Sequence, residues 1–198
     1  MRIVRYTLTE RVMHWLAGLA YVYLLIGGLA LYAPQLYWLA YLLGGGPAAR
    51  FWHPWAGLLF TAAMLWMHAS WRADMRLTAA DRLWSKALRS YIENRDEEVP
   101  PSGRFNAGQK QFYYVMAVGT LLLLVSGLVM WFPERAPHGL LPAAVILHEA
   151  AALVTIGAFI IHVYMGLFLV PGSFTAIVRG WVSPQWAKAH HRLWFERR

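Results

Sequence analysis

Four long apolar runs lie along the chain, and polar stretches separate them. An α-helix needs about 20 consecutive, mostly apolar residues to cross the hydrocarbon core of a bilayer. The pattern therefore predicts an all-α integral membrane protein, a four-helix transmembrane bundle in a single domain. The predicted spans cover residues 12–32, 53–71, 112–132 and 147–170, with a polar loop at residues 72–111 and a polar tail at residues 171–198.

The composition supports a membrane protein and excludes several other classes. Hydrophobic residues make up 59% of the chain and charged residues 14%, which is too apolar for an ordinary soluble domain. There is no cysteine, so disulfides, iron–sulfur clusters and covalently attached haem are excluded on this chain. The net charge of +8 comes without a nucleic-acid motif, so we expect membrane lipid as a partner and no nucleic acid.

The basic residues predict the direction of the spans. Three lie before the first run, eight in residues 72–111 and five in the tail, whereas the other two connections hold one each, Arg50 and Arg135. Cytoplasmic loops of membrane proteins carry an excess of Lys and Arg. We therefore expect both termini and the 72–111 loop in the cytoplasm, in a multi-pass protein of the bacterial cytoplasmic (inner) membrane.

Histidines inside the apolar runs are the candidate functional residues. His148 and His162 are fourteen residues apart, which places them on one helix face, roughly 21 Å apart along the axis. An intramembrane His normally faces the bundle interior or binds a ligand. Two such pairs at two depths are what two six-coordinate haems require, because haem iron takes axial His ligands.

The predicted topology suggests how these histidines pair. His53 and His148 start spans that both run inward, so they lie together near the outer surface as ligands of an outer haem. His162 lies deeper, and both His14 and His68 match its depth, so the residues alone leave its partner open. The remaining histidines are expected to be solvated, in a loop and in the tail: His138, His190 and His191.

Several other positions carry structural expectations. Gly27 and Gly28 narrow the first span, either to seat a porphyrin or to let a neighbouring helix approach. Gly119 and Gly127, with Ser126, suggest that the third span packs closely behind the helices that carry the histidines. Pro54 is expected at the first helical position of the second span, where its missing N–H is tolerated. Residues 72–84 are expected to form a solvated surface helix. The tail aromatics suit an interfacial anchor: Trp181, Trp186, Trp194 and Phe195.

Five stretches together carry a resemblance to a known family. They are RYTLTERVMHW (residues 5–15), FWHPWAG (51–57), FNAGQK (105–110), HVYMG (162–166) and VSPQWAKAHHRLW (182–194). In order and spacing they resemble the γ subunit, cytochrome b556, of respiratory formate dehydrogenases, a membrane dihaem cytochrome b family. The likeness covers nearly the whole chain and weakens in the first outer loop and in residues 72–102.

The resemblance implies the ligands of two haem b groups. It implies that His53 and His148 are the axial ligands of the outer haem iron, and that His14 and His162 are those of the inner one. The residues alone left the partner of His162 open, and the resemblance implies that this partner is His14 and not His68.

The resemblance also implies a quinone site on the cytoplasmic side, for menaquinone or ubiquinone. Without the family, the residues predict that Asn106 and Gly108 form a helix N-cap and its turn, and both roles can hold at once. The implied quinone contacts are Asn106, Gly108, Gln109 and Met165.

The expected function is electron transfer for anaerobic respiration, without a formate-oxidising site or a catalytic residue on this chain. The implied partners are an iron–sulfur β subunit, which passes electrons through outer and inner haem to quinone, and a molybdenum or tungsten pterin α subunit. A higher oligomer of the complex is left open. The alternatives are the cytochrome b of a nickel–iron hydrogenase or of a thiosulfate or polysulfide reductase, a non-redox membrane anchor, and a metal transporter.

Overall fold

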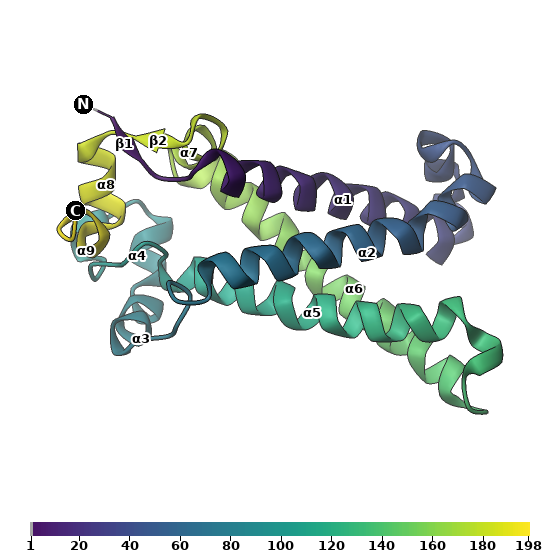
Figure 1. Cartoon of the computed structure of the whole chain (residues 1–198). Helices are drawn as coiled ribbons and strands as arrows, with labels where there is room; N and C mark the ends of the chain where they lie inside the picture. Colours follow the sequence, from purple (N-terminus) through teal and green to yellow (C-terminus); the bar gives the residue numbers. More distant parts are fainter. Residues whose placement is uncertain (1) are drawn as a thin grey trace. The chain divides into compact units, whose positions relative to one another are not determined.

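A computed structural model describes residues 2–198, and helices dominate it (Figure 1). The long helices each have 25 or 26 residues, so each is about 38 Å long. Within the described part of the chain they are α1 (Leu8–Tyr32), α2 (Gly46–Trp71), α5 (Ala107–Trp131) and α6 (Leu140–Tyr164), with α6 continued by the π-helical turn η4 (Met165–Leu169). The helical fold class predicted from the sequence is confirmed.

Short elements connect the long helices and build the ends of the chain. The connections contain η1 (Pro34–Leu43), α3 (Ala79–Lys86), α4 (Leu88–Ile92), η2 (Asp96–Glu98) and η3 (Pro133–Arg135). The chain ends contain β1 (Ile3–Val4), α7 (Ser173–Arg179), β2 (Trp181–Val182), α8 (Pro184–His190) and α9 (Arg192–Phe195).

Three helices within residues 2–198 are long and apolar enough to cross a membrane: Leu8–Tyr32, Ala107–Trp131 and Leu140–Leu169. Their outward side chains are themselves apolar, and Leu153 and Val154 on α6 are 59% and 62% exposed. A soluble protein does not display such continuous apolar faces. The fourth predicted span corresponds to α2, whose sequence includes Arg50, His53 and His68 and is less apolar than the other three.

The observed helices begin earlier than the predicted spans and end close to them. Helix α2 begins at Gly46, with Pro47 in its first turn, and Pro54 lies inside the helix. The prediction that Pro54 opens the helix was therefore wrong. Pro47 takes the position that suits a proline, and His53 lies about two turns from the start of the helix, not at its mouth.

The chain forms two compact units, and each is described separately. Unit 1 comprises residues 2–11, 69–116 and 157–198, and unit 2 comprises residues 12–68 and 117–156. In unit 2, segments of α1 and α2 pack antiparallel (Figure 1). Tyr21 contacts Phe60 with ring centroids 5.4 Å apart. Two turns further along α1, Gly27 packs against His53.

Helices α5 and α6 form a second antiparallel pair in unit 2. Gly119 faces Thr155 so closely that a Cβ on this glycine would overlap Thr155 Cγ2. Two turns along α5, Gly127 faces His148. The expectation of close packing by small residues on the third span is therefore confirmed, because only glycine permits these approaches.

Unit 1 joins the two ends of the chain. Strand β1 pairs antiparallel with β2, with Ile3 opposite Val182 and Val4 opposite Trp181 (Figure 1). The tail buries a small core of Ala176, Val182 and Ala187, against which the half-buried Trp186, Trp194 and Phe195 pack. The tail aromatics therefore help to form a small folded cap at the end of the chain, in addition to the interfacial role expected from the sequence.

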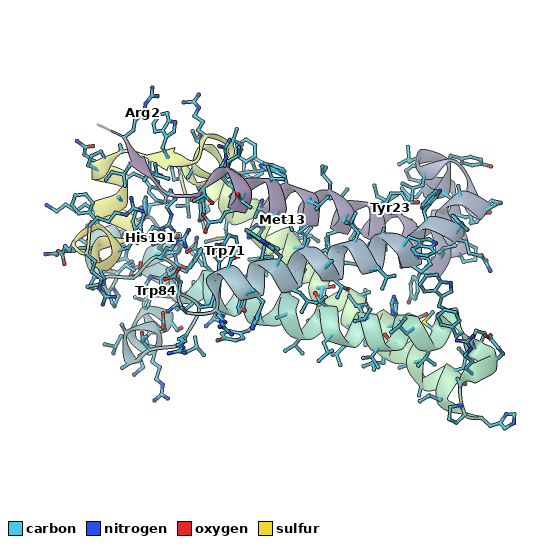
Figure 2. All side chains as sticks on the ribbon, viewed as in Figure 1. Arg2, Met13, Tyr23, Trp71, Trp84 and His191 are labelled. Carbon is cyan, nitrogen blue, oxygen red and sulfur yellow. The ribbon has the colours of Figure 1, made fainter. Side chains whose placement is uncertain are left out.

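His191 lies in the centre of this cap and is 2% exposed (Figure 2). The expectation that it is solvated was wrong, because the tail docks its ring onto the segment before α5. Nδ1 of His191 donates to the carbonyl of Gly103 at 2.9 Å, and Nε2 lies 3.1 Å from Nη2 of Arg5, which donates to it. The imidazole is therefore held in its neutral form.

Acidification is expected to destabilise unit 1 through His191. Burial lowers the pKa of this imidazole well below its ordinary value of 6.5, and the charges of Arg5 and His190 lower the pKa further. Below about pH 6.5 the His191 side chain of the unfolded chain binds a proton, whereas that of the folded chain does not. The free energy of unfolding therefore falls by about 1.4 kcal/mol for each pH unit below that value. We expect the midpoint of thermal unfolding to drop between pH 7.5 and 5.5, and to drop less in His191→Gln, which keeps a donor and an acceptor without titrating.

Candidate functional site

His53 and His148 form a facing pair in unit 2. Their ring centroids are 6.4 Å apart and their planes are tilted by 56°, so the rings are not stacked on each other. A metal–imidazole bond is about 2 Å long and the ring centre lies about 1 Å behind its nitrogen, so two imidazoles on opposite sides of one metal have centres roughly 6 Å apart. The observed separation matches that of two axial ligands of a single metal.

The ring of His148 is oriented by a hydroxyl on α5. Oγ of Ser126 lies 2.9 Å from His148 Nδ1 and donates its own proton to the carbonyl of Leu122 at 2.6 Å. Since this proton is already used, the ring must donate from Nδ1, and Nε2 keeps its lone pair. Metal-ligating histidines typically donate their other N–H to such a partner.

Two glycines lie directly behind the pair of imidazoles. A Cβ on Gly27 of α1 would come within 3.3 Å of His53 Nδ1, and one on Gly127 of α5 within 3.3 Å of His148 Cε1. These distances are tighter than ordinary carbon contacts, so each glycine allows the neighbouring helix to support a ring closely. All four long helices thus contribute to one site, with the two imidazoles on α2 and α6 and the glycines behind them on α1 and α5.

The polar atoms of the pair also fit a bound ligand. Nδ1 of His53 is buried, and residues 2–198 provide it with no hydrogen-bond partner. This nitrogen faces Gly27 on α1, so Nε2 is the ring nitrogen of His53 that is left for a ligand. A bare metal ion would need three or four protein ligands, and the described residues contain no cluster of three or more His, Asp or Glu able to hold one. Two imidazoles suit a metal whose other ligands come from a porphyrin.

Removing the Ser126 hydroxyl is expected to weaken this site. Ser126→Ala removes the hydroxyl partner of His148 Nδ1, and loss of such a partner typically lowers metal affinity about 10- to 100-fold. Haem titration of the apoprotein measures the effect. Thr61→Ala is the matched control, because its hydroxyl also donates to a carbonyl one turn back, that of Gly57, at 2.8 Å. Equal haem affinity in the two variants would contradict the role given to Ser126.

The other histidines of the spans differ in their surroundings. His162, in unit 1, stacks on Phe112 with ring centroids 4.2 Å apart and planes 5° apart, one turn before the π-helical turn η4. His14 lies in unit 2, where it is half-buried and meets Trp15 edge-on. His68 is exposed at the end of α2, as is His138 in the loop after α5.

The FNAGQK motif begins α5 in unit 1. Backbone N–H of Gln109 donates to Asn106 Oδ1 at 2.9 Å, and backbone N–H of Asn106 donates to Gln109 Oε1 at 3.0 Å. This reciprocal pair is a capping box, so the N-cap reading of Asn106 is confirmed. Lys110 follows, and its ammonium pairs with Asp81 of α3 at 2.8 Å, with both side chains buried.

Two aromatic residues that the sequence did not single out cover this motif. Trp84 of α3, labelled in Figure 2, is 3% exposed. Tyr91 of α4 is 9% exposed, and the ring centroids of the two residues are 4.8 Å apart. They form a cluster with Ala107 and Val170, against which Met165 packs. The expectation of a merely solvated face in this segment was therefore wrong. Aromatic residues recurring at a seven-residue spacing in an otherwise polar loop were the available signal.

The fold and the facing histidines define a helical membrane protein with a site suited to haem. The chain belongs to the prokaryotic cytochrome b561 family, whose profile matches residues 5–180. This family implies haem b as a cofactor.

Individual relatives match over nearly the full chain. The chain is 36% identical over 196 residues to the cytochrome b556(fdo) subunit of formate dehydrogenase from Escherichia coli strain K12, covering 98% of this chain and 92% of the relative. It is 30% identical over 197 residues to the formate dehydrogenase cytochrome b556 subunit of Haemophilus influenzae, covering 98% and 82%. The nitrate-inducible cytochrome b556(Fdn) subunit of Escherichia coli strain K12 is 29% identical over 196 residues, covering 98% and 90%.

Proposed function

We propose that this chain is the membrane-anchoring dihaem cytochrome b subunit of a respiratory formate dehydrogenase, which passes electrons to a quinone. The observation that carries the proposal is the pair of His53 and His148, whose ring centres are 6.4 Å apart. The relatives of this chain are named as formate dehydrogenase cytochrome b556 subunits, which favours formate over hydrogen, thiosulfate or polysulfide as the electron donor of the complex.

Four histidines hold two haem b groups in this proposal. His53 and His148 ligate the outer haem iron, and His14 and His162 ligate the inner one. Bound haem supplies one-electron redox chemistry, tuned by its axial ligands and their hydrogen bonds. The chain's own contribution is to fix the imidazoles, as Ser126 does for His148.

The proposed topology has α2 as a fourth crossing and both termini in the cytoplasm. At about 39 Å, the 26 residues of α2 exceed the roughly 30 Å of the hydrocarbon core. The basic residues support this direction, because they gather in the chain ends and in residues 72–111. The quinone site is then cytoplasmic, beside the start of α5 and the end of α6, with Asn106, Gly108, Gln109 and Met165 as its contacts.

The proposed partners are an iron–sulfur subunit on the outer side and a molybdenum or tungsten pterin subunit that oxidises formate. This chain takes electrons from the outer side, and the quinone takes two electrons and two protons, the protons coming from the cytoplasm. Turnover is electrogenic because electrons cross the membrane inward and join protons from the cytoplasm on the quinone.

Purification of the tagged chain from its native membranes tests the proposal. We expect two b haems per chain, co-purifying iron–sulfur and pterin subunits, and haem reduction on addition of formate. A haem-free preparation would instead indicate a non-redox anchor. Haem that is reduced by hydrogen but not by formate would indicate a hydrogenase cytochrome.

A further inference from the structure

We propose that Tyr91 is a positioning residue of the quinone site and that α3 and α4 form one wall of it. This inference rests on the proposed function, since it concerns the same cytoplasmic site. It assigns a role in quinone recognition to the loop between α2 and α5.

The amide of Asn106 is held from both ends. Its Oδ1 accepts from the backbone N–H of Gln109 at 2.9 Å, which caps α5. Its Nδ2 donates to the hydroxyl of Tyr91 at 3.2 Å, and the side chain is 2% exposed. The two contacts determine which way the amide faces, and the one at Nδ2 is made by α4.

Quinone chemistry explains why this orientation matters. A quinone carbonyl only accepts hydrogen bonds and therefore needs a donor, and the side chain of Asn106 donates only through Nδ2. The amide nitrogen carries two N–H groups in fixed planar geometry. When Tyr91 holds one of them, the direction of the other is set by the same contact.

The remaining proposed quinone contacts lie against the same wall. A Cβ on Gly108 would come within 3.3 Å of Trp84 Cη2 and 3.5 Å of Asn106 Oδ1, so the indole covers this glycine in van der Waals contact. Met165, at the end of α6, packs against the cluster that contains Trp84 and Tyr91. The wall thus joins α3 and α4 to the residues from α5 and α6.

A buried ion pair holds the wall in place. Lys110 Nζ donates to Asp81 Oδ2 at 2.8 Å and to the carbonyl of Arg76 at 2.9 Å. Asp81 Oδ2 also accepts from the backbone N–H and the hydroxyl of Thr78, which caps α3. Removing one member of a buried ion pair is strongly destabilising, so α3 is firmly fixed against the start of α5.

The test uses the native complex with Tyr91→Phe in this chain and decyl-benzoquinone as the acceptor. The variant keeps the buried ring and removes the acceptor of the Asn106 N–H. We expect KM for decyl-benzoquinone to rise about three- to tenfold, the range that loss of one hydrogen bond gives. Haem content and formate-driven haem reduction should stay unchanged. Tyr114→Phe on α5 is the matched control, since it removes a tyrosine hydrogen bond to the carbonyl of Met75 in the turn after α2.

A second pair of variants separates positioning from packing. Asn106→Ser keeps an oxygen for the cap and lacks the amide donor, so Tyr91→Phe should leave KM unchanged in that background. An equal rise in KM in both backgrounds, an unchanged KM in Tyr91→Phe alone, or loss of haem in that variant would each overturn the inference. If formate reduces the haem of the wild type but decyl-benzoquinone does not reoxidise it, the quinone site itself is wrong, and the inference fails with it.

Discussion

Replacing either His53 or His148 by alanine is expected to remove one of the two proposed haems and to abolish formate-driven quinone reduction. The two imidazoles lie at the separation of two ligands of one metal, so a haem held by this pair would lose one of its two protein ligands in either variant. Electrons from the outer side would then lose their first carrier in this chain, so the effect on turnover should be close to complete.

Pyridine-haemochrome quantification and reduced-minus-oxidised spectra measure this effect in the purified complex. His138→Ala is the control, because this histidine is exposed in the loop between α5 and α6. Retention of two low-spin haems in both His53→Ala and His148→Ala would contradict the outer ligand pair.

Alanine at His14 is expected to remove the inner haem, whereas alanine at His68 is expected to leave both haems in place. His14 is half-buried in the first span and is the proposed inner ligand, whereas His68 is exposed at the end of α2. Loss of the inner haem should stop quinone reduction while the outer haem still accepts electrons from formate.

The same spectra, recorded after formate addition, distinguish the two variants. In His14→Ala, one haem should become reduced by formate and then fail to be reoxidised by quinone. Haem loss in His68→Ala with two haems retained in His14→Ala would instead move the inner haem onto α2 and α6. That outcome would also remove support for the quinone contacts carried over from the family.

The ends of the long helices could be predicted well from the sequence, but their starts could not. Tyr32 and Trp71 end the first two helices as predicted, because polar or helix-breaking residues follow them. Helix α1 begins at Leu8, ahead of the predicted span, since Glu10 and Arg11 are good helix formers that hydropathy scores as polar. Hydropathy measures solvent preference, and helical structure extends beyond the apolar part.

The histidine candidates and the small residues expected to pack behind them were visible in the sequence, but the contacts between their atoms were not. An intramembrane His stands out by its cost in lipid. Ser126 is an ordinary serine until the structure places its hydroxyl 2.9 Å from His148. His191 was wrongly expected to be solvated, because its burial depends on a contact with Gly103, 88 residues earlier in the chain.

By itself, the sequence determined that this is a helical membrane protein and which histidines are candidates for haem. Those conclusions depend on local composition and periodicity, which each segment carries alone. The tertiary structure decided which atoms meet: the separation of His53 and His148, the glycines behind them, and the contact of Tyr91 with Asn106. These depend on the register between helices, which arises only when side chains from distant segments pack together.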